Sequence, residues 1–221
     1  MKAFASWSGG KDCMLAVYKT IKSNKHQVEF LLNMTDDEHV KSRSHGISKD
    51  LIVSQAHAMG IDLLQQSTQH DKYEVKFKEA ISILKEKGIE AGIFGDIYLE
   101  AHRVWIERVC KEMDIKAIFP LWGAPTKDLL KEFIDLGFKT ILVAINKQKL
   151  SNNWVGRIIN QEFYDDITKL DGIDPCAELG EYHSFVFDGP TFSEALKLNK
   201  LELVDTDKTL YQTIEIYTDK V

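Results

Sequence analysis

A glycine-rich hexapeptide between an apolar segment and an amphipathic one limits the folds open to this chain. Residues 3–7 are mostly apolar, residues 8–13 read SGGKDC, and apolar residues then recur at helical spacing from Met14 to Ile21. This pattern predicts a buried strand, a tight glycine turn and a helix that packs back on the strand. We therefore expect an α/β fold whose first unit is strand, turn and helix.

The alternation of strand and helix continues to about residue 122. Apolar runs fall at residues 28–34, 61–64, 91–94 and 115–121, and helical patterns fall between them at residues 48–60, 71–87 and 99–113. Parallel strands need crossover connections of this kind. The sequence therefore predicts a parallel sheet with helices on both faces and a ligand site at the carboxyl ends of its strands.

The pattern becomes less regular after residue 122. A helix is predicted at residues 126–136, strands are predicted at residues 139–145, 182–187 and 212–217, and glycine and proline mark the segments between them. Such a mixture is typical of an α+β lobe. We expect two units, residues 1–122 and a smaller lobe over residues 123–221.

Composition excludes several classes of protein. Lys plus Arg number 28 and Asp plus Glu number 34, which gives a net charge of −6, so binding of nucleic acid by broad phosphate neutralisation is not expected. The three cysteines are far apart and form no CxxC pair, which argues against a disulfide framework or a zinc ribbon. No apolar run approaches the length of a membrane span. We expect a cytoplasmic protein that is not bound to a membrane.

The residues of the hexapeptide suit phosphate binding. Gly9 and Gly10 let the backbone approach an anion, and the following helix presents its N–H groups and the positive end of its dipole. Lys11 adds positive charge, and Asp12 is explained best as a ligand of Mg²⁺ or as a residue that orients the loop. The spacing is not that of a Walker A loop. The simpler alternative is a tight strand-to-helix turn with solvated charges.

The hexapeptide resembles the pyrophosphate-binding loop SGGxDS of the ATP pyrophosphatases, and further segments extend the likeness. These segments are residues 93–100 (IFGDIYLE), 119–123 (FPLWG), 154–157 (WVGR) and 174–190 (DPCAELGEYHSFVFDGP). Together they resemble the diphthine–ammonia ligase (diphthamide synthase) family of that superfamily. Cys13 stands where the superfamily loop usually has Ser, and Ala177 stands where the family often has Gly. We expect Cys13 to preserve nucleotide binding and to weaken any hydroxyl contact to phosphate.

This resemblance implies a fold and an activity. The fold is a Rossmann-like PP-loop domain of the HUP type that binds ATP, over residues 1–122, with a C-terminal substrate and catalytic lobe over residues 123–221. The activity is a ligation that uses ATP and Mg²⁺ to adenylate a carboxylate and then amidate it with ammonia, releasing AMP and pyrophosphate. The family's named substrate is diphthine on translation elongation factor 2. No glutaminase signature is apparent, so free ammonia is expected, and a homodimer is left open.

Other functions remain open at this stage. In a bacterial host the substrate would be a different carboxylate or a tRNA, although the acidic balance and the lack of a basic stripe count against tRNA. A nucleotide-binding regulatory protein without turnover is the non-enzymatic alternative, and the departure at Cys13 makes it conceivable.

The resemblance assigns a nucleotide site to the first unit. The residues expected to bind ATP are Ser8, Gly9, Gly10, Lys11, Asp12, Cys13, Met34, Thr35, Gly95 and Asp96. Lys11 is also expected to be catalytic, because it would hold the β and γ phosphates. Asp12 and Asp96 are expected near Mg²⁺. Met34 and Thr35 end the second strand, where superfamily members hold adenine through backbone contacts.

The segment around residues 178–183 concentrates polar groups that could act on ammonia. The resemblance implies catalytic roles for Glu178, Glu181 and His183 and a substrate contact for Tyr182. If a strand begins at Tyr182, Glu181 and His183 share one face, so we expect this pair to bind ammonium and accept its proton. Taken without the resemblance, the same groups fit a hydrogen-bonded link between two lobes better.

Four charged residues are further candidates for substrate binding. Arg43 and His45 lie in the polar stretch after the second strand, and Glu100 and Arg103 begin the helix after residues 95–96. A charged first turn is equally a routine feature of helix capping, and His45 lacks the spacing of a zinc ligand.

Overall fold

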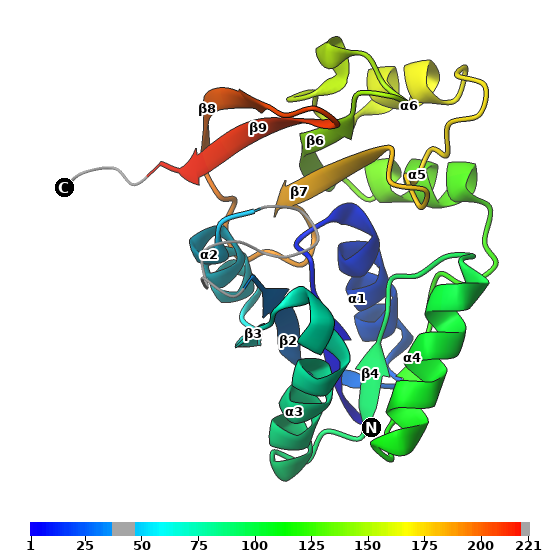
Figure 1. The fold of residues 1–221 in the computed structure, drawn as a ribbon, viewed down its shortest axis with the longest axis vertical. Helices are drawn as coiled ribbons and strands as arrows, with labels where there is room; N and C mark the ends of the chain where they lie inside the picture. Colours follow the sequence, from blue (N-terminus) through cyan, green and yellow to red (C-terminus); the bar gives the residue numbers. More distant parts are fainter. Residues whose placement is uncertain (37–46, 218–221) are drawn as a thin grey trace.

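The first half of the chain forms a five-stranded parallel sheet (Figure 1). The computed structural model describes residues 1–36 and 47–217. The strands are β1 (Lys2–Ser6), β2 (Gln27–Thr35), β3 (Asp62–Ser67), β4 (Ala91–Ile93) and β5 (Lys116–Ile118). They run in the order β3-β2-β1-β4-β5, so β1 lies at the centre and the hexapeptide leaves the sheet at its middle. This confirms the predicted parallel sheet.

Four helices cover the two faces of this sheet. They are α1 (Lys11–Ser23), α2 (Lys49–Met59), α3 (Tyr73–Glu86) and α4 (Glu100–Glu112), and the 3-10 turn η1 (His70–Lys72) precedes α3. Ala3 and Ala5 of β1 pack in one core cluster with α1 and α2, and Phe4 packs in the other with α3 and α4, because successive strand residues point to opposite faces. Within the described residues, no helix has the length and apolarity to cross a membrane.

The rest of the described chain forms a smaller α+β lobe, as predicted. Its elements are α5 (Thr126–Asp135), β6 (Lys139–Asn146), η2 (Asn152–Trp154), α6 (Gln161–Ile167), β7 (Tyr182–Asp188), β8 (Leu198–Asp205) and β9 (Thr209–Ile216). The four strands form an antiparallel sheet in the order β7-β6-β9-β8. Strand β8 escaped prediction because it is an edge strand that is exposed along almost its whole length and has no alternation of apolar residues.

The two sheets share a hydrophobic core. One cluster of buried residues contains Met14 and Ile52 from the first sheet's helices together with Leu142 and Phe185 from the second sheet. Residues 119–125 join β5 to α5, and the domain boundary near residue 122 remains a prediction. The shared core implies that the two lobes support each other's position.

Gln55 of α2 ties the glycine loop to both lobes. Its side chain is fully buried, and its Nε2 donates to the Gly9 carbonyl at 3.1 Å and to the Val186 carbonyl in β7 at 2.7 Å. Its Oε1 accepts a hydrogen bond from Trp7 Nε1 at 2.8 Å. One amide therefore satisfies three buried polar groups, two of them backbone carbonyls on opposite sides of the interface between the lobes.

We expect Gln55→Leu to destabilise the whole protein. Leucine keeps the approximate volume but removes the acceptor of the Trp7 N–H, the amide donor to the Val186 carbonyl and one of the two donors to the Gly9 carbonyl, which predicts a loss of about 2–4 kcal/mol of unfolding free energy. Urea unfolding followed by circular dichroism measures this loss. Gln148→Leu is the control because Gln148 is exposed in a turn. Equal midpoints for the two variants would contradict the role of Gln55.

Candidate functional site

A cavity of about 300 Å³ lies between the carboxyl edge of the parallel sheet and the second lobe. Its wall includes the loop after β1, the end of β2, the turn after β4, and residues 176–178 and 182–184. The predicted site residues that line it are Ser8, Lys11, Asp12, Cys13, Met34, Gly95, Asp96, Glu178, Tyr182 and His183. The carboxyl edge is where parallel α/β sheets usually bind ligands.

Gly9 and Gly10 shape the loop instead of lining the cavity. Gly9 has φ +83°, and its carbonyl accepts hydrogen bonds from the Gln55 side chain and from the Val186 N–H at 3.0 Å. Gly10 precedes α1, and its N–H donates to Ser8 Oγ at 3.4 Å. Cys13 Sγ donates to the Gly10 carbonyl at 3.1 Å. The thiol at this position therefore takes part in a local hydrogen bond that closes the first turn of the helix.

Lys11 is a buried cation at the centre of the cavity wall. Its Nζ donates to Asp12 Oδ2 at 2.8 Å and to the Cys176 carbonyl, and it lies 4.9 Å from the centre of the Tyr182 ring. Burial works to lower the pKa of this amine, but Asp12, Tyr182 and Cys176 together outweigh it, so the pKa of Lys11 is raised. Lys11 is thus a permanent positive charge, suited to bind phosphate oxygens.

Gly95 brings Asp96 next to the glycine loop. A Cβ on Gly95 would lie 2.9 Å from the backbone of Asp12 and of Cys13, so only glycine permits this approach. Asp96 follows directly and pairs through Oδ1 with His102 Nδ1 at 3.3 Å. The turn after β4 therefore delivers a carboxylate to the same cavity as Lys11.

Three cavity carboxylates have raised pKa values. Burial raises the pKa of Asp12 and of Asp96, and burial together with the Asp12 charge raises the pKa of Glu178 to about 7. Glu178 Oε2 accepts a hydrogen bond from the Ile97 N–H at 3.2 Å, which moderates this shift. Glu178 can therefore gain or lose a proton near neutral pH.

Asp12 and Asp96 fit a Mg²⁺ ion that is carried by phosphates. Each lines the cavity, and the Asp96 charge contributes to the raised pKa of Asp12. Mg²⁺ in nucleotide sites is usually held by one or two carboxylates, phosphate oxygens and water. Among the described residues, no group of three or more His, Cys, Asp or Glu side chains is arranged to hold a metal ion. A metal ion here would therefore need phosphate oxygens as further ligands.

His183 lines the cavity as a neutral imidazole. Burial lowers its pKa to about 4, and the nearby Lys11 charge lowers it in the same direction. At neutral pH it therefore carries no charge and is a weak base. Its expected general-base role is less suited to this position than a positioning role.

The expected pairing of Glu181 with His183 at the cavity needs correction. Glu181 is fully buried outside the cavity wall, where its carboxylate accepts hydrogen bonds from Lys149 Nζ at 3.1 Å, Leu179 N–H at 3.1 Å and Asp174 N–H at 3.5 Å. Strand β7 begins one residue later, so the alternation of strand faces does not extend back to Glu181. Its surroundings indicate a structural role.

The other expected contacts lie away from the cavity wall or outside the described residues. Thr35 is buried at the end of β2, and its carbonyl accepts the Thr68 N–H at 3.1 Å. Glu100 is exposed, and the Arg103 guanidinium lies 4.7 Å from the centre of the Trp122 ring. Neither Glu100 nor Arg103 is part of the cavity wall. Arg43 and His45 lie outside the described residues.

Among the cavity residues that sequence reasoning missed, two contact Lys11 directly. Ser184 Oγ accepts the Lys11 N–H at 3.2 Å, and the Cys176 carbonyl accepts the Lys11 ammonium. Both lie in the second lobe more than 160 residues from Lys11, so no local pattern signals the contacts. Only the alternation of β7, in which Ser184 shares a face with Tyr182, could have suggested Ser184.

The chain matches two family models and is similar to several known proteins over most of its length. Residues 1–117 match the family model of the diphthamide synthase N-terminal domain, and residues 125–219 match that of the diphthamide synthase C-terminal domain. The diphthine–ammonia ligases of rat and mouse are 27% and 28% identical over 228 residues, covering 92% of this chain and 85% of each relative. The human diphthine–ammonia ligase is 25% identical over the same length.

A solved structure resembles the chain more distantly. A crystal structure described as a "predicted subunit of tRNA methyltransferase" from Methanocaldococcus jannaschii is 18% identical, with a TM-score of 0.46. The alignment covers 86% of this chain and 98% of that one.

We expect Glu178→Gln to stabilise the protein at alkaline pH. The native pKa of about 7 lies above the ordinary glutamate value of 4.5, so the native state holds the proton more tightly and wild type loses stability as the pH rises from about 4.5 to about 7. The variant does not ionise and should exceed wild type by about 1–3 kcal/mol at pH 8 and match it near pH 4.5, after allowance for solvent screening.

Urea unfolding at both pH values measures this difference. Glu100→Gln is the matched control, because Glu100 is exposed and outside the cavity wall. If the difference in unfolding free energy between wild type and Glu178→Gln does not grow with pH, the pKa of Glu178 is not raised by its surroundings.

Proposed function

Because the chain belongs to the diphthamide synthase family, we propose that it adenylates the carboxylate of diphthine and then amidates it with ammonia, releasing AMP and pyrophosphate. It is an enzyme of the diphthine–ammonia ligase type. The protein substrate in this proposal is translation elongation factor 2, and the reaction takes place in the cytoplasm. Residues 1–122 bind ATP. Residues 123–221 bind the substrate and contribute part of the catalytic machinery.

One observation carries this proposal: a single cavity combines a buried cation, carboxylates suited to Mg²⁺ and a carboxyl group that titrates near pH 7. Lys11 supplies the cation, Asp12 and Asp96 supply the metal ligands, and Glu178 supplies the titrating group. Adenylation needs Lys11, Asp12 and Asp96 to bind ATP with its metal ion. Amidation needs Glu178 to accept a proton.

In the first step, the chain binds the phosphates of ATP and stabilises the leaving pyrophosphate. The substrate carboxylate attacks the α-phosphorus, a new C–O–P linkage forms, and the bond between the α and β phosphates breaks. Lys11 and the N–H groups at the start of α1 stabilise the negative charge that develops on the pyrophosphate. Mg²⁺, held by Asp12 and Asp96, would offset part of the phosphate charge.

In the second step, the chain manages the proton of the nucleophile. The attached nitrogen releases one proton to solvent as AMP departs. Ammonium cannot attack a carbonyl, so a further proton must leave before the C–N bond forms. Glu178 lines the cavity and ionises near pH 7, which suits it to accept that proton. Neutral His183 lines the same cavity and would orient the acyl group, whereas the Tyr182 hydroxyl donates to the Pro175 carbonyl.

The decisive experiment is a product analysis that distinguishes AMP from ADP. Purified protein is incubated with ATP, Mg²⁺ and ammonium, with and without elongation factor 2 that carries diphthine. We expect AMP and pyrophosphate in equal amounts, together with amidated factor, only in the complete mixture.

The other outcomes separate the parts of the proposal. AMP formed without dependence on the factor would contradict the substrate and keep the adenylation. ADP, or no turnover with any mixture, would contradict the adenylation itself.

Two cavity variants should separate binding of ATP from turnover. Lys11→Met removes the buried charge and should weaken ATP binding at least about tenfold, because a charge-assisted contact to phosphate is lost. Glu178→Gln should leave ATP binding within about twofold and lower kcat by about 10²–10⁴.

Isothermal titration calorimetry and the AMP assay measure these two effects. Lys19→Met is the matched control, because Lys19 lies on the same helix and pairs with Glu132 at 2.7 Å. Parallel loss of binding and turnover in Glu178→Gln would assign that residue to ATP binding instead of proton transfer.

A further inference from the structure

We propose that Lys149 is a positioning residue that holds the loop of residues 174–181 in the shape that presents Glu178 to the cavity. The inference rests on the proposed function for its kinetic test but makes a separate claim about the structure. Lys149 follows β6, whereas the loop precedes β7, so the contact joins two segments that are 30 residues apart in sequence.

The Lys149 ammonium contacts the loop at two points. Its Nζ donates to the Leu179 carbonyl at 2.8 Å and to Glu181 Oε1 at 3.1 Å. Glu181 is fully buried, and its other carboxyl oxygen accepts the Leu179 N–H. A buried carboxylate needs such partners, so removal of the ammonium would leave Glu181 with an uncompensated charge.

The restraint passes from Glu181 to the part of the loop that faces the cavity. Glu181 Oε1 accepts the Asp174 N–H at 3.5 Å. The Asp174 carboxylate in turn accepts the N–H groups of Cys176 at 3.2 Å and Glu178 at 2.9 Å. The hydrogen bonds therefore form a continuous chain from Lys149 to the backbone of Glu178.

The loop needs an external restraint because its backbone is strained. Ala177 has φ +62°, a left-handed conformation that residues with a Cβ disfavour. The strained residue lies between Cys176, whose carbonyl accepts the Lys11 ammonium, and Glu178, whose carboxylate accepts the Ile97 N–H. Release of the loop would move both contacts together.

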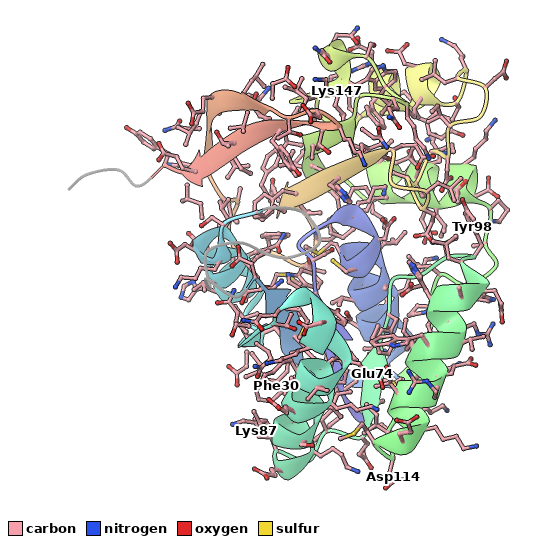
Figure 2. The ribbon with its side chains drawn as sticks, in the orientation of Figure 1. Phe30, Glu74, Lys87, Tyr98, Asp114 and Lys147 are labelled. Carbon is pink, nitrogen blue, oxygen red and sulfur yellow. The ribbon has the colours of Figure 1, made fainter. Side chains whose placement is uncertain are left out.

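The pKa of Glu178 depends on the charged groups around it, so a change in that pKa reports a change in the position of its carboxyl group. The charged groups that act on it are Asp12 and Lys11 from the start of α1 and Asp96 from the turn after β4. Tyr98, labelled in Figure 2, contacts the loop because its hydroxyl donates to Asp174 Oδ2 at 3.2 Å. A looser loop would admit water and weaken the effect of Asp12 and Asp96, so the pH at which Glu178 titrates would fall.

The test compares Lys149→Met with Lys147→Met, and Lys149→Arg serves as the rescue variant. Lys147 lies in the same turn at the outer end of the second lobe, where it donates to Asp205 Oδ1 at 2.5 Å and not to the loop (Figure 2). We expect Lys149→Met to lower kcat about 10–100-fold with KM for ATP within about twofold. The acid limb of the pH profile of kcat should move at least about half a pH unit lower. Lys147→Met should match wild type, and Lys149→Arg should recover most of kcat.

A readout that needs no turnover keeps this inference separate from the proposed function. The pH dependence of the urea midpoint, compared between wild type and Glu178→Gln, reports the ionisation of Glu178 directly. In the Lys149→Met background the same comparison should show that ionisation at a lower pH.

Each result decides between the two claims. An unchanged titration and an unchanged kcat in Lys149→Met would overturn the positioning role. A titration shift in a protein that forms no AMP would support the positioning role and contradict the proposed function. If Lys149→Met does not fold, Glu181→Gln, which removes the partner charge and keeps the volume, is measured in its place.

Discussion

The structure depends on keeping the Lys11 charge stable inside the protein. An ammonium group that leaves water loses several kcal/mol of solvation unless other groups replace it. Asp12 supplies one partner from the same loop, but the Cys176 carbonyl and the Tyr182 ring come from the second lobe. The second lobe is therefore required for Lys11 of the first lobe to be both buried and charged. The shared hydrophobic core and the Gln55 hydrogen bonds hold the lobes in the arrangement that this charge needs.

The cavity nevertheless contains more negative charge than Lys11 can neutralise. Asp12, Asp96 and Glu178 all have raised pKa values, which means that the folded protein disfavours their ionised forms. A core selected for stability alone would not gather these groups. Their arrangement makes sense if positive charge enters with a ligand, as a divalent cation or ammonium would bring it. Loss of stability at this cavity is then the cost of a site that is ready for its substrates.

The predictable parts of this protein are those that local sequence determines. The glycine loop, the helices that follow each strand and the parallel sheet appear in the spacing of a few neighbouring residues, and most of the expected cavity residues reached the cavity. The Gln55 link, the Lys149 contact with Glu181 and the place of Glu181 itself were not predictable. They depend on pairs that are 131 and 32 residues apart, and a buried amide or lysine has no sequence pattern that distinguishes it from an exposed one.

His183 and Glu178, both on the second lobe's side of the cavity, show why residue type alone misleads. A histidine in water titrates near neutral pH and a glutamate well below it, so sequence reasoning favours His183 as the base. Burial stabilises the neutral form of each group, and it therefore moves the pKa of His183 down to about 4 and that of Glu178 up to about 7. Lys11 pushes His183 further in the same direction, and Asp12 does the same to Glu178. The cavity thereby exchanges the usual roles: the carboxyl group is the one that can take a proton at neutral pH, and the imidazole is the one with a fixed, neutral hydrogen-bonding character.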